Sequence, residues 1–152
     1  MSEGKINPIN QMLKLALTTA ASHYQYYHSA AMNVETPDVK ALLMVLAEVE
    51  DELMDLIGGM MATGIVDALE ELQQTEDRDE LPDETPFDLT REDTDPRIFI
   101  CNKALRKEVK GYTFYLAIAA RATSRPISRL FEYLAHVKLL QIKKIRRACE
   151  TF

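Results

Sequence analysis

Residues 16–31 read ALTTAASHYQYYHSAA, and residues 104–119, which lie 88 positions later, read ALRKEVKGYTFYLAIA. The same offset places residues 41–53, ALLMVLAEVEDEL, over residues 129–141, RLFEYLAHVKLLQ. Between residues 16 and 53, nine positions are identical to their partners, and they include the pairs Tyr24–Tyr112 and Tyr27–Tyr115. Amphipathic helices share Ala and Leu by chance, but chance does not preserve matched tyrosines and an ungapped register through a turn. The repeat therefore predicts a duplicated unit.

Each copy of the repeat has the pattern of a helical hairpin. In the first copy, residues on one helical face recur every three or four positions: Leu13, Leu17, Ala20, Tyr24, Tyr27 and Ala31. A turn follows at residues 34–37, where Thr36 is suited to an N-cap and Pro37 to a first helical position. The next stripe comprises Leu43, Leu46, Ala47, Glu50, Leu53 and Ile57. Gly58-Gly59 is expected to weaken or kink the end of this helix. Hairpin one therefore spans about residues 10–62.

The second copy repeats this organisation after a long connection. Its stripes are Leu105, Glu108, Tyr112, Tyr115 and Ala119, then, after a turn at Ser124–Pro126, Leu130, Leu134, Lys138, Gln141 and Ile145. Hairpin two spans about residues 98–150, and the crossover about residues 63–97. A short helix is expected at residues 66–72, but QQTEDRDELPDETPFDLTREDTDPR, residues 73–97, is too polar and proline-rich for the core. The prediction is a single all-α domain over residues 1–152, a four-helix bundle of two duplicated hairpins joined by a long acidic crossover.

The composition indicates a globular protein, because 47% hydrophobic and 28% charged residues exclude a disordered chain. No apolar stretch is long enough to cross a bilayer. The N-terminal residues lack the basic and apolar regions of a secretory signal, so the expected location is the cytoplasm. The two cysteines, Cys101 and Cys149, are expected near the same end of hairpin two. Reduced thiols are the favoured expectation there, with a redox-sensitive pair as the alternative.

Charge is strongly polarised along the chain. Residues 1–96 hold 5 Lys/Arg and 21 Asp/Glu, a balance of −16, whereas residues 97–152 hold 13 and 3, a balance of +10. The favoured explanation is that the acidic crossover lies against the basic hairpin. The alternative is an anionic or protein partner bound at Lys138, Lys143, Lys144, Arg146 and Arg147. Nucleic acid is a disfavoured partner, because the net charge of the whole chain is −6.

Folding each hairpin at its turn brings one layer of inward positions to the same height. The layer comprises Ala20, Glu50, Leu53, Glu108, Lys138 and Gln141. Four of these side chains are polar or charged on otherwise apolar faces. Because an unpaired buried charge costs several kcal/mol, these groups must bind each other or a ligand.

The segments EVKGYTFYLAIAA, residues 108–120, and VKALLMVLAEVEDEL, residues 39–53, resemble the rubrerythrin-type ferritin-like superfamily. In that family each hairpin carries an inward Glu seven residues before a Tyr, and a Glu-x-x-His motif on its next helix. Four Glu and two His then bind two iron or manganese ions. The resemblance implies a ferritin-like bundle and a homodimer through helix faces. It also implies that Tyr27 and Tyr115 flank the metal layer.

This sequence departs from the family motif at most ligand positions. Glu108 and Glu50 match ligand glutamates, whereas Ala20 and Lys138 replace the other two. Leu53 and Gln141 replace the histidines. Two carboxylates cannot balance the roughly four positive charges of a dinuclear site. The degenerate site is therefore expected to bind no metal.

We expect the Lys138 ammonium to substitute for the metal, pairing with Glu50 and Glu108 while Gln141 fills the remaining hydrogen bonds. The predicted function is a non-catalytic ferritin-like protein with a structural, regulatory or partner-binding role and no cofactor. The alternative is an iron- or manganese-binding oxidoreductase or iron-binding protein with an atypical site of Glu50, Glu108 and His23. Schiff-base chemistry at Lys138 is disfavoured, because neighbouring carboxylates keep its amine protonated.

Other candidate groups have simpler explanations. The acidic run EVEDELMD, residues 48–55, looks like a metal-binding cluster. Helical geometry, however, directs Glu48, Asp51, Glu52 and Asp55 toward solvent. His28 and His136 are expected at the surface or its boundary.

Overall fold

The computed structural model describes residues 8–74 and 80–150, and within these ranges it contains helices and no strand. The α-helices are α1 (Pro8–Asn33), α2 (Pro37–Thr63), α3 (Val66–Gln74), α4 (Pro96–Arg121) and α5 (Arg125–Cys149), with a 3-10 helix η1 (Leu89–Arg91) before α4. The predicted all-α class is confirmed. The expected short helix after hairpin one is α3.

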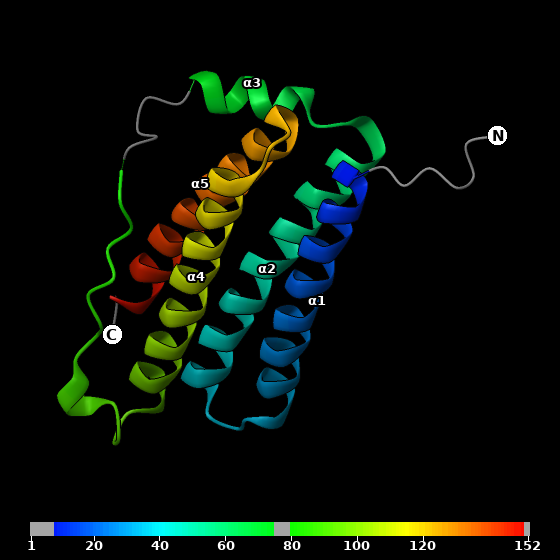
Figure 1. Ribbon diagram of the computed structural model, residues 1–152. Helices are drawn as coiled ribbons and strands as arrows, with labels where there is room; N and C mark the ends of the chain where they lie inside the picture. The colour runs from blue at the N-terminus through cyan, green and yellow to red at the C-terminus, as the bar shows by residue number, and fades with distance from the viewer. Residues whose placement is uncertain (1–7, 75–79, 151–152) are drawn as a thin grey trace.

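The four long helices lie side by side, with α1 packed on α2 and α4 packed on α5 (Figure 1). The α1–α2 turn and the α4–α5 turn lie at opposite ends of the molecule. Helix α3 crosses the end where α2 finishes, and the crossover then runs down the outside of the second hairpin to the start of α4 (Figure 1). The crossover returns the chain to the end of the bundle where α2 begins. Helix α4 starts at that end and therefore runs in the same direction as α2 (Figure 1).

The helices of the two hairpins begin and end at corresponding positions of the sequence repeat. Helices α1 and α4 begin at residues 8 and 96 and end at 33 and 121, so both boundaries keep the 88-residue offset. Helices α2 and α5 begin at residues 37 and 125, again 88 apart. The buried residues of α1 are Leu13, Ala16, Ala20, Tyr27 and Ala31, and each has a buried counterpart in α4. Leu17 and Tyr24 of the predicted stripe are only half-buried.

Helix α2 begins and ends close to its predicted bounds. Thr36 and Pro37 start it as predicted, although the Thr36 side chain makes no capping hydrogen bond. It continues through Gly58-Gly59 to Thr63, close to the predicted end of hairpin one. It stops at Gly64, whose φ of 91° is a conformation that favours glycine.

The core fills the space between the long helices with aliphatic side chains. Its most buried members include Leu13, Leu46, Ile57, Leu130, Leu134, Ile142 and Ile145. None of the helices in the described ranges combines the length and apolar character that a membrane span requires.

The acidic crossover lies against the basic hairpin, as the favoured charge explanation predicted. Lys143 Nζ is 2.6 Å from Glu80 Oε2, and Arg146 Nε is 3.3 Å from Asp83 Oδ2. Arg146 also donates to the Thr85 carbonyl at 2.7 Å. These contacts tie residues 80–85 to α5 and neutralise part of its charge.

The five cations predicted for an anionic partner are therefore mostly engaged within the chain. Besides Lys143 and Arg146, Lys144 pairs with Glu52 at 2.7 Å and Lys138 is buried. Arg147 alone of the five is exposed and makes no ion pair with the described residues. These five positions consequently offer little free positive charge.

Cys101 and Cys149 form a disulfide, which corrects the expectation of reduced thiols. The two residues are 48 positions apart in sequence, but the hairpin brings their Cα atoms to 6.1 Å. The sequence correctly placed them at the same end of hairpin two. The bond joins the first turns of α4 to the last turn of α5, and both cysteines are buried.

Candidate functional site

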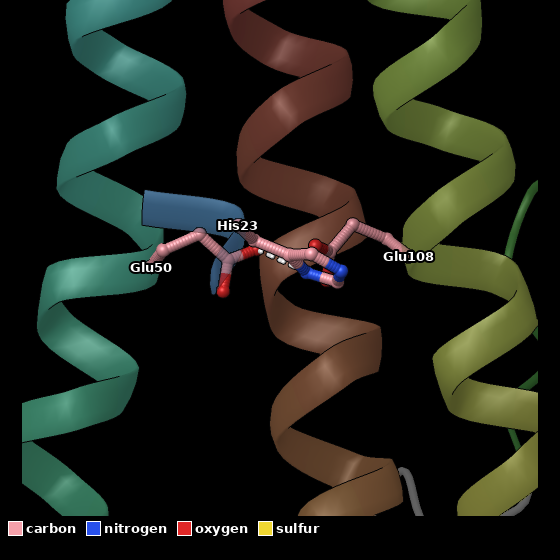
Figure 2. Close-up of side chains that lie close together, drawn as sticks. All are labelled: His23, Glu50 and Glu108. Atoms are coloured by element: carbon pink, nitrogen blue, oxygen red, sulfur yellow. Dashed lines mark ion pairs between the residues drawn. The ribbon is translucent and has the colours of Figure 1, made fainter. Parts of the chain in front are cut away.

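Three ionisable side chains lie in the middle of the apolar core. Glu50 of α2 and Glu108 of α4 are each 1% exposed, and Lys138 of α5 is 5% exposed. His23 of α1 approaches them from the fourth long helix. Figure 2 shows Glu50, Glu108 and His23 pointing toward one another from three different helices. We call these four residues the buried cluster.

Lys138 is paired with one carboxylate of the buried cluster. Its Nζ donates to Glu108 Oε2 at 2.9 Å. No hydrogen bond or ion pair joins it to Glu50, so of the two expected pairings the structure shows the one with Glu108. Glu50 reaches from a different helix and lies nearer His23.

Gly111 makes room for the Lys138 stem. A Cβ atom at Gly111 would lie 3.3 Å from Lys138 Cε and 3.6 Å from its Cδ. Gly111 stands 88 positions after His23, so one hairpin supplies an imidazole at this position and the other supplies space. Sequence reasoning missed Gly111. A glycine inside a long helix, three residues after Glu108, was the signal available.

His23 and Glu50 form the second half of the buried cluster. His23 Nδ1 lies 3.6 Å from Glu50 Oε1, which is too long for a good hydrogen bond. Neither oxygen of Glu50 nor His23 Nδ1 has a hydrogen-bond partner in the described part of the chain. One ligand atom each from His23, Glu50 and Glu108 lies within 4.8 Å of the others. The atypical trio predicted from the sequence is thus brought together.

The pKa values of the cluster are strongly perturbed. Burial raises the pKa of Glu108 to about 8, although the positive charge of Lys138 acts in the opposite direction. Burial also disfavours ionised Glu50, but His23, Glu108 and the charge of Lys138 together hold its pKa below the ordinary value. Burial lowers the pKa of Lys138, yet the two carboxyl groups outweigh it and the pKa is raised. One proton on Glu108, ionised Glu50 and charged Lys138 give a cluster without net charge.

Two tyrosines lie beside the buried cluster. Tyr27 is 3% exposed and Tyr115 is 7% exposed. Burial raises the pKa of both phenols, and the negative charges of Glu108 and Glu50 raise them further. Both side chains are therefore neutral at physiological pH.

The remaining positions of the predicted layer do not contribute ligands. Ala20 and Leu53 are buried and apolar. Gln141 does not fill hydrogen bonds within the cluster, because its Nε2 donates instead to the Val49 carbonyl at 3.1 Å. Gln141 therefore links α5 to the α2 backbone next to Glu50.

A narrow cleft connects the buried cluster to the surface. It encloses about 160 Å³ between α1 and α4 and is lined by residues that include His23, Thr19, Phe114, Tyr115 and Lys138. His23 is 26% exposed and forms part of the cleft wall. Of the buried cluster, His23 and Lys138 line this cleft, whereas Glu50 and Glu108 do not.

The other candidates lie apart from the buried cluster. Glu48, Asp51, Glu52 and Asp55 are all exposed on α2, as predicted. His28 and His136 are half-buried. These residues therefore add no donor to the site.

The donors present do not fit a dinuclear metal centre. The dinuclear centres of ferritin-like bundles use four carboxylates and two histidines, whereas the cluster here offers two carboxyl groups, one histidine and a buried ammonium. The three donors His23, Glu50 and Glu108 converge closely enough to suit one metal ion. No family model matches this chain, and no curated protein and no solved structure does so either. The fold and the cluster define the protein as a bundle of long helices with ionisable side chains buried in its core.

Proposed function

We propose that this chain is a non-catalytic, rubrerythrin-like member of the ferritin-like superfamily that arose by duplication of a helical hairpin. The shared 88-residue offset of sequence and helix boundaries supports duplication. The central height of Glu50, Glu108 and Lys138 supports descent from a metal-binding layer. The proposed role is structural, regulatory or partner-binding, with an internal ionic cluster in place of the metal site.

The observation that carries this proposal is the 2.9 Å contact between Lys138 Nζ and Glu108 Oε2. A buried ammonium at this place supplies positive charge where the family has metal. Replacing one partner of a buried ion pair leaves a charge without compensation, and this typically costs about 3–5 kcal/mol. The cluster therefore holds α4 and α5 in one register and draws α1 and α2 toward it.

Lys138→Met tests the structural role of the cluster. We expect this variant to lose about 3–5 kcal/mol of unfolding free energy in urea titrations. The double variant K138M/E50Q removes both the ammonium and the carboxylate that stays ionised beside it, and it should recover at least half of that loss. If K138M unfolds at the same urea concentration as the parent protein, the ion pair contributes nothing and the proposal fails.

A second candidate function is supported by the unpartnered atoms of the cluster. Glu50 Oε1, Glu50 Oε2 and His23 Nδ1 are buried and lack hydrogen bonds within the described ranges. Such atoms suit a single iron or manganese ion bound by His23, Glu50 and Glu108. A bound ion would supply redox chemistry. Charge weighs against this alternative, because a divalent ion and Lys138 bring about three positive charges against two carboxylates.

Metal analysis separates the two candidates. We expect purified, tag-free protein from cells grown with added iron and manganese to hold far less than one Fe, Mn or Zn per chain. Near-stoichiometric metal that disappears in Glu50→Gln and His23→Ala, but persists in the exposed-site control Glu48→Gln, would establish the metal-binding alternative and overturn the metal-free proposal.

Quaternary structure and location extend the proposal. We propose a homodimer through exposed apolar residues of the long helices, such as Leu15 and Phe114, which are 63% and 61% exposed. The cytoplasmic location stays a prediction from the sequence, and the Cys101–Cys149 bond is unusual for that compartment. Sedimentation of the parent protein and of Leu15→Ser and Phe114→Ser variants tests the dimer.

A further inference from the structure

A second, larger cleft lies on the outside of the bundle, away from the buried cluster. It encloses about 820 Å³ between the outer face of α4 and residues 84–89 of the crossover. Its apolar lining residues are Pro86, Leu89, Phe99, Leu105 and Val109. Leu89 and Phe99 are 60% and 47% exposed, so the lining faces solvent. A volume of this size is in the range of small-molecule binding sites.

The crossover wall of this cleft is firmly attached to α4. Asn102 accepts a hydrogen bond from the Phe87 backbone N–H at 2.7 Å and donates one to the Phe87 carbonyl at 3.2 Å. It also donates to Glu92 Oε2 at 3.1 Å. Phe87 is buried, and the Arg146 guanidinium lies 4.6 Å from its ring centre. The cleft therefore has two fixed walls.

Positive charge concentrates on the α4 side of the cleft. Four cations, Lys103, Arg106, Lys107 and Lys110, line it at helical spacing of three and four residues. Lys103 and Lys107 also lean toward Tyr26, with Lys103 Nζ 2.7 Å from its hydroxyl. Arg106 and Lys110 are exposed and form no ion pair with any residue that the structure describes. Their charges are available to a ligand.

Few groups in the lining are free to form specific hydrogen bonds with a ligand. The Asn102 amide is already bonded to Phe87 and Glu92. Glu84 is the one acidic residue in the lining. A nucleobase would need donors and acceptors that this surface does not offer. An aliphatic chain with one anionic head needs only apolar contact and positive charge.

We propose that this cleft binds a long-chain fatty acid. Its alkyl chain lies on Phe99, Leu89 and Val109, and its carboxylate pairs with Arg106 and Lys110. From Phe99 to Lys110 the helix advances about 16 Å, so an extended alkyl chain and its carboxylate can lie along α4. This inference does not depend on the function proposed for the buried cluster, because the two sites share no residue except Lys107, which lines both clefts.

The test measures displacement of the fluorescent fatty acid cis-parinaric acid from the full chain. Dodecanoate and tetradecanoate are added below their micellar concentrations, with dodecanol as the uncharged comparison. We expect the acids to displace the probe at least tenfold more strongly than the alcohol. Tetradecanoate should bind more tightly than dodecanoate, by up to about fourfold for each added methylene that is fully buried.

Matched variants locate the site. Arg106→Gln with Lys110→Gln should weaken dodecanoate binding about tenfold, equivalent to about 1.4 kcal/mol. The control pair Lys14→Gln with Arg125→Gln removes the same charge from exposed positions outside the cleft and should leave binding unchanged. Leu89→Ser changes only an exposed crossover residue, so it should fold normally while weakening binding several-fold.

Several outcomes would overturn the proposal. Equal binding of dodecanol and dodecanoate would exclude recognition of the carboxylate. If the cleft and control double variants weakened dodecanoate binding equally, the effect would come from the net charge of the protein and not from the cleft. Binding only to anionic phosphatidylglycerol vesicles, or only to an acidic amphipathic peptide, with no effect of monomeric fatty acid, would assign this surface to a membrane or a protein instead.

Discussion

Replacing Glu108 by Gln should change how the stability of the protein depends on pH. Burial raises the pKa of Glu108 from 4.5 to about 8 in the folded chain. Between these two values the folded protein retains a proton that the unfolded chain has released. The stability that Glu108 contributes is therefore fully present below its unfolded pKa and is lost as pH rises through about 8.

The size of the effect follows from proton linkage. One proton retained by the folded state changes the unfolding free energy by about 1.4 kcal/mol per pH unit. From about pH 5.5 to about pH 7.5 the loss has an upper limit of about 2.7 kcal/mol, and we expect about 1–3 kcal/mol because the cluster shares its charges. Glu50 and Lys138 do not change the slope within this window. The stability from Glu50 is lost only as pH falls below 4.5, because its folded-state pKa is lowered. The stability from Lys138 is lost only as pH rises above 10.5, because its folded-state pKa is raised.

Urea denaturation followed by circular dichroism, at constant ionic strength and with a chelator present, measures the effect. Glutamine at position 108 cannot titrate, yet its amide oxygen can still accept a hydrogen bond from Lys138. The unfolding free energy of the parent protein should fall across this pH window. For Glu108→Gln the fall per pH unit should be smaller, by about the 1.4 kcal/mol that one retained proton contributes. The exposed Glu48→Gln variant should follow the parent. Parallel curves for the parent and Glu108→Gln would refute the proposed titration of Glu108.

Two further predictions concern packing around the cluster and the disulfide. Gly111→Ala should stabilise the protein less than Gly59→Ala does, by about 1 kcal/mol or more in urea titrations, because its added Cβ would lie 3.3 Å from Lys138 Cε and the buried lysine would have to shift. Gly59→Ala has open space around its Cβ and should stabilise the protein by about 0.5–1 kcal/mol; equal effects of the two substitutions would contradict the tight fit at Gly111. Replacing Cys101 and Cys149 by Ser should cost about 4 kcal/mol, because the bond closes a segment of 48 residues. A thiol count of two in the unreduced, denatured parent protein would show that the bond does not form.

The sequence predicted the helices because local interactions govern their formation. Apolar spacing located both hairpins, and prolines after Thr36 and Ser124 marked the turns to within two residues. It also predicted the common height of Glu50, Glu108 and Lys138, because residues equally distant from a turn meet in an antiparallel pair. The predicted end of hairpin one near residue 62 is close to the end of α2 at Thr63, and Gly64 ends that helix through its backbone conformation.

Contacts within the site depended on the exact positions of several helices. Periodicity could not show that Lys138 binds Glu108, that Gln141 turns to the Val49 carbonyl, or that His23 approaches Glu50. These outcomes depend on which rotamers the neighbouring helices leave open, and the space beside Gly111 is one such constraint.

By itself, the sequence determined an all-helical chain with two equivalent hairpins and ionisable residues on their inner faces, because each of these follows from local spacing. Only the tertiary structure decided the partners of those residues, the Cys101–Cys149 bond and the cationic cleft beside α4. The physical reason is distance: these features join atoms that are far apart in the chain, and their separations are set by how the helices and the crossover pack together.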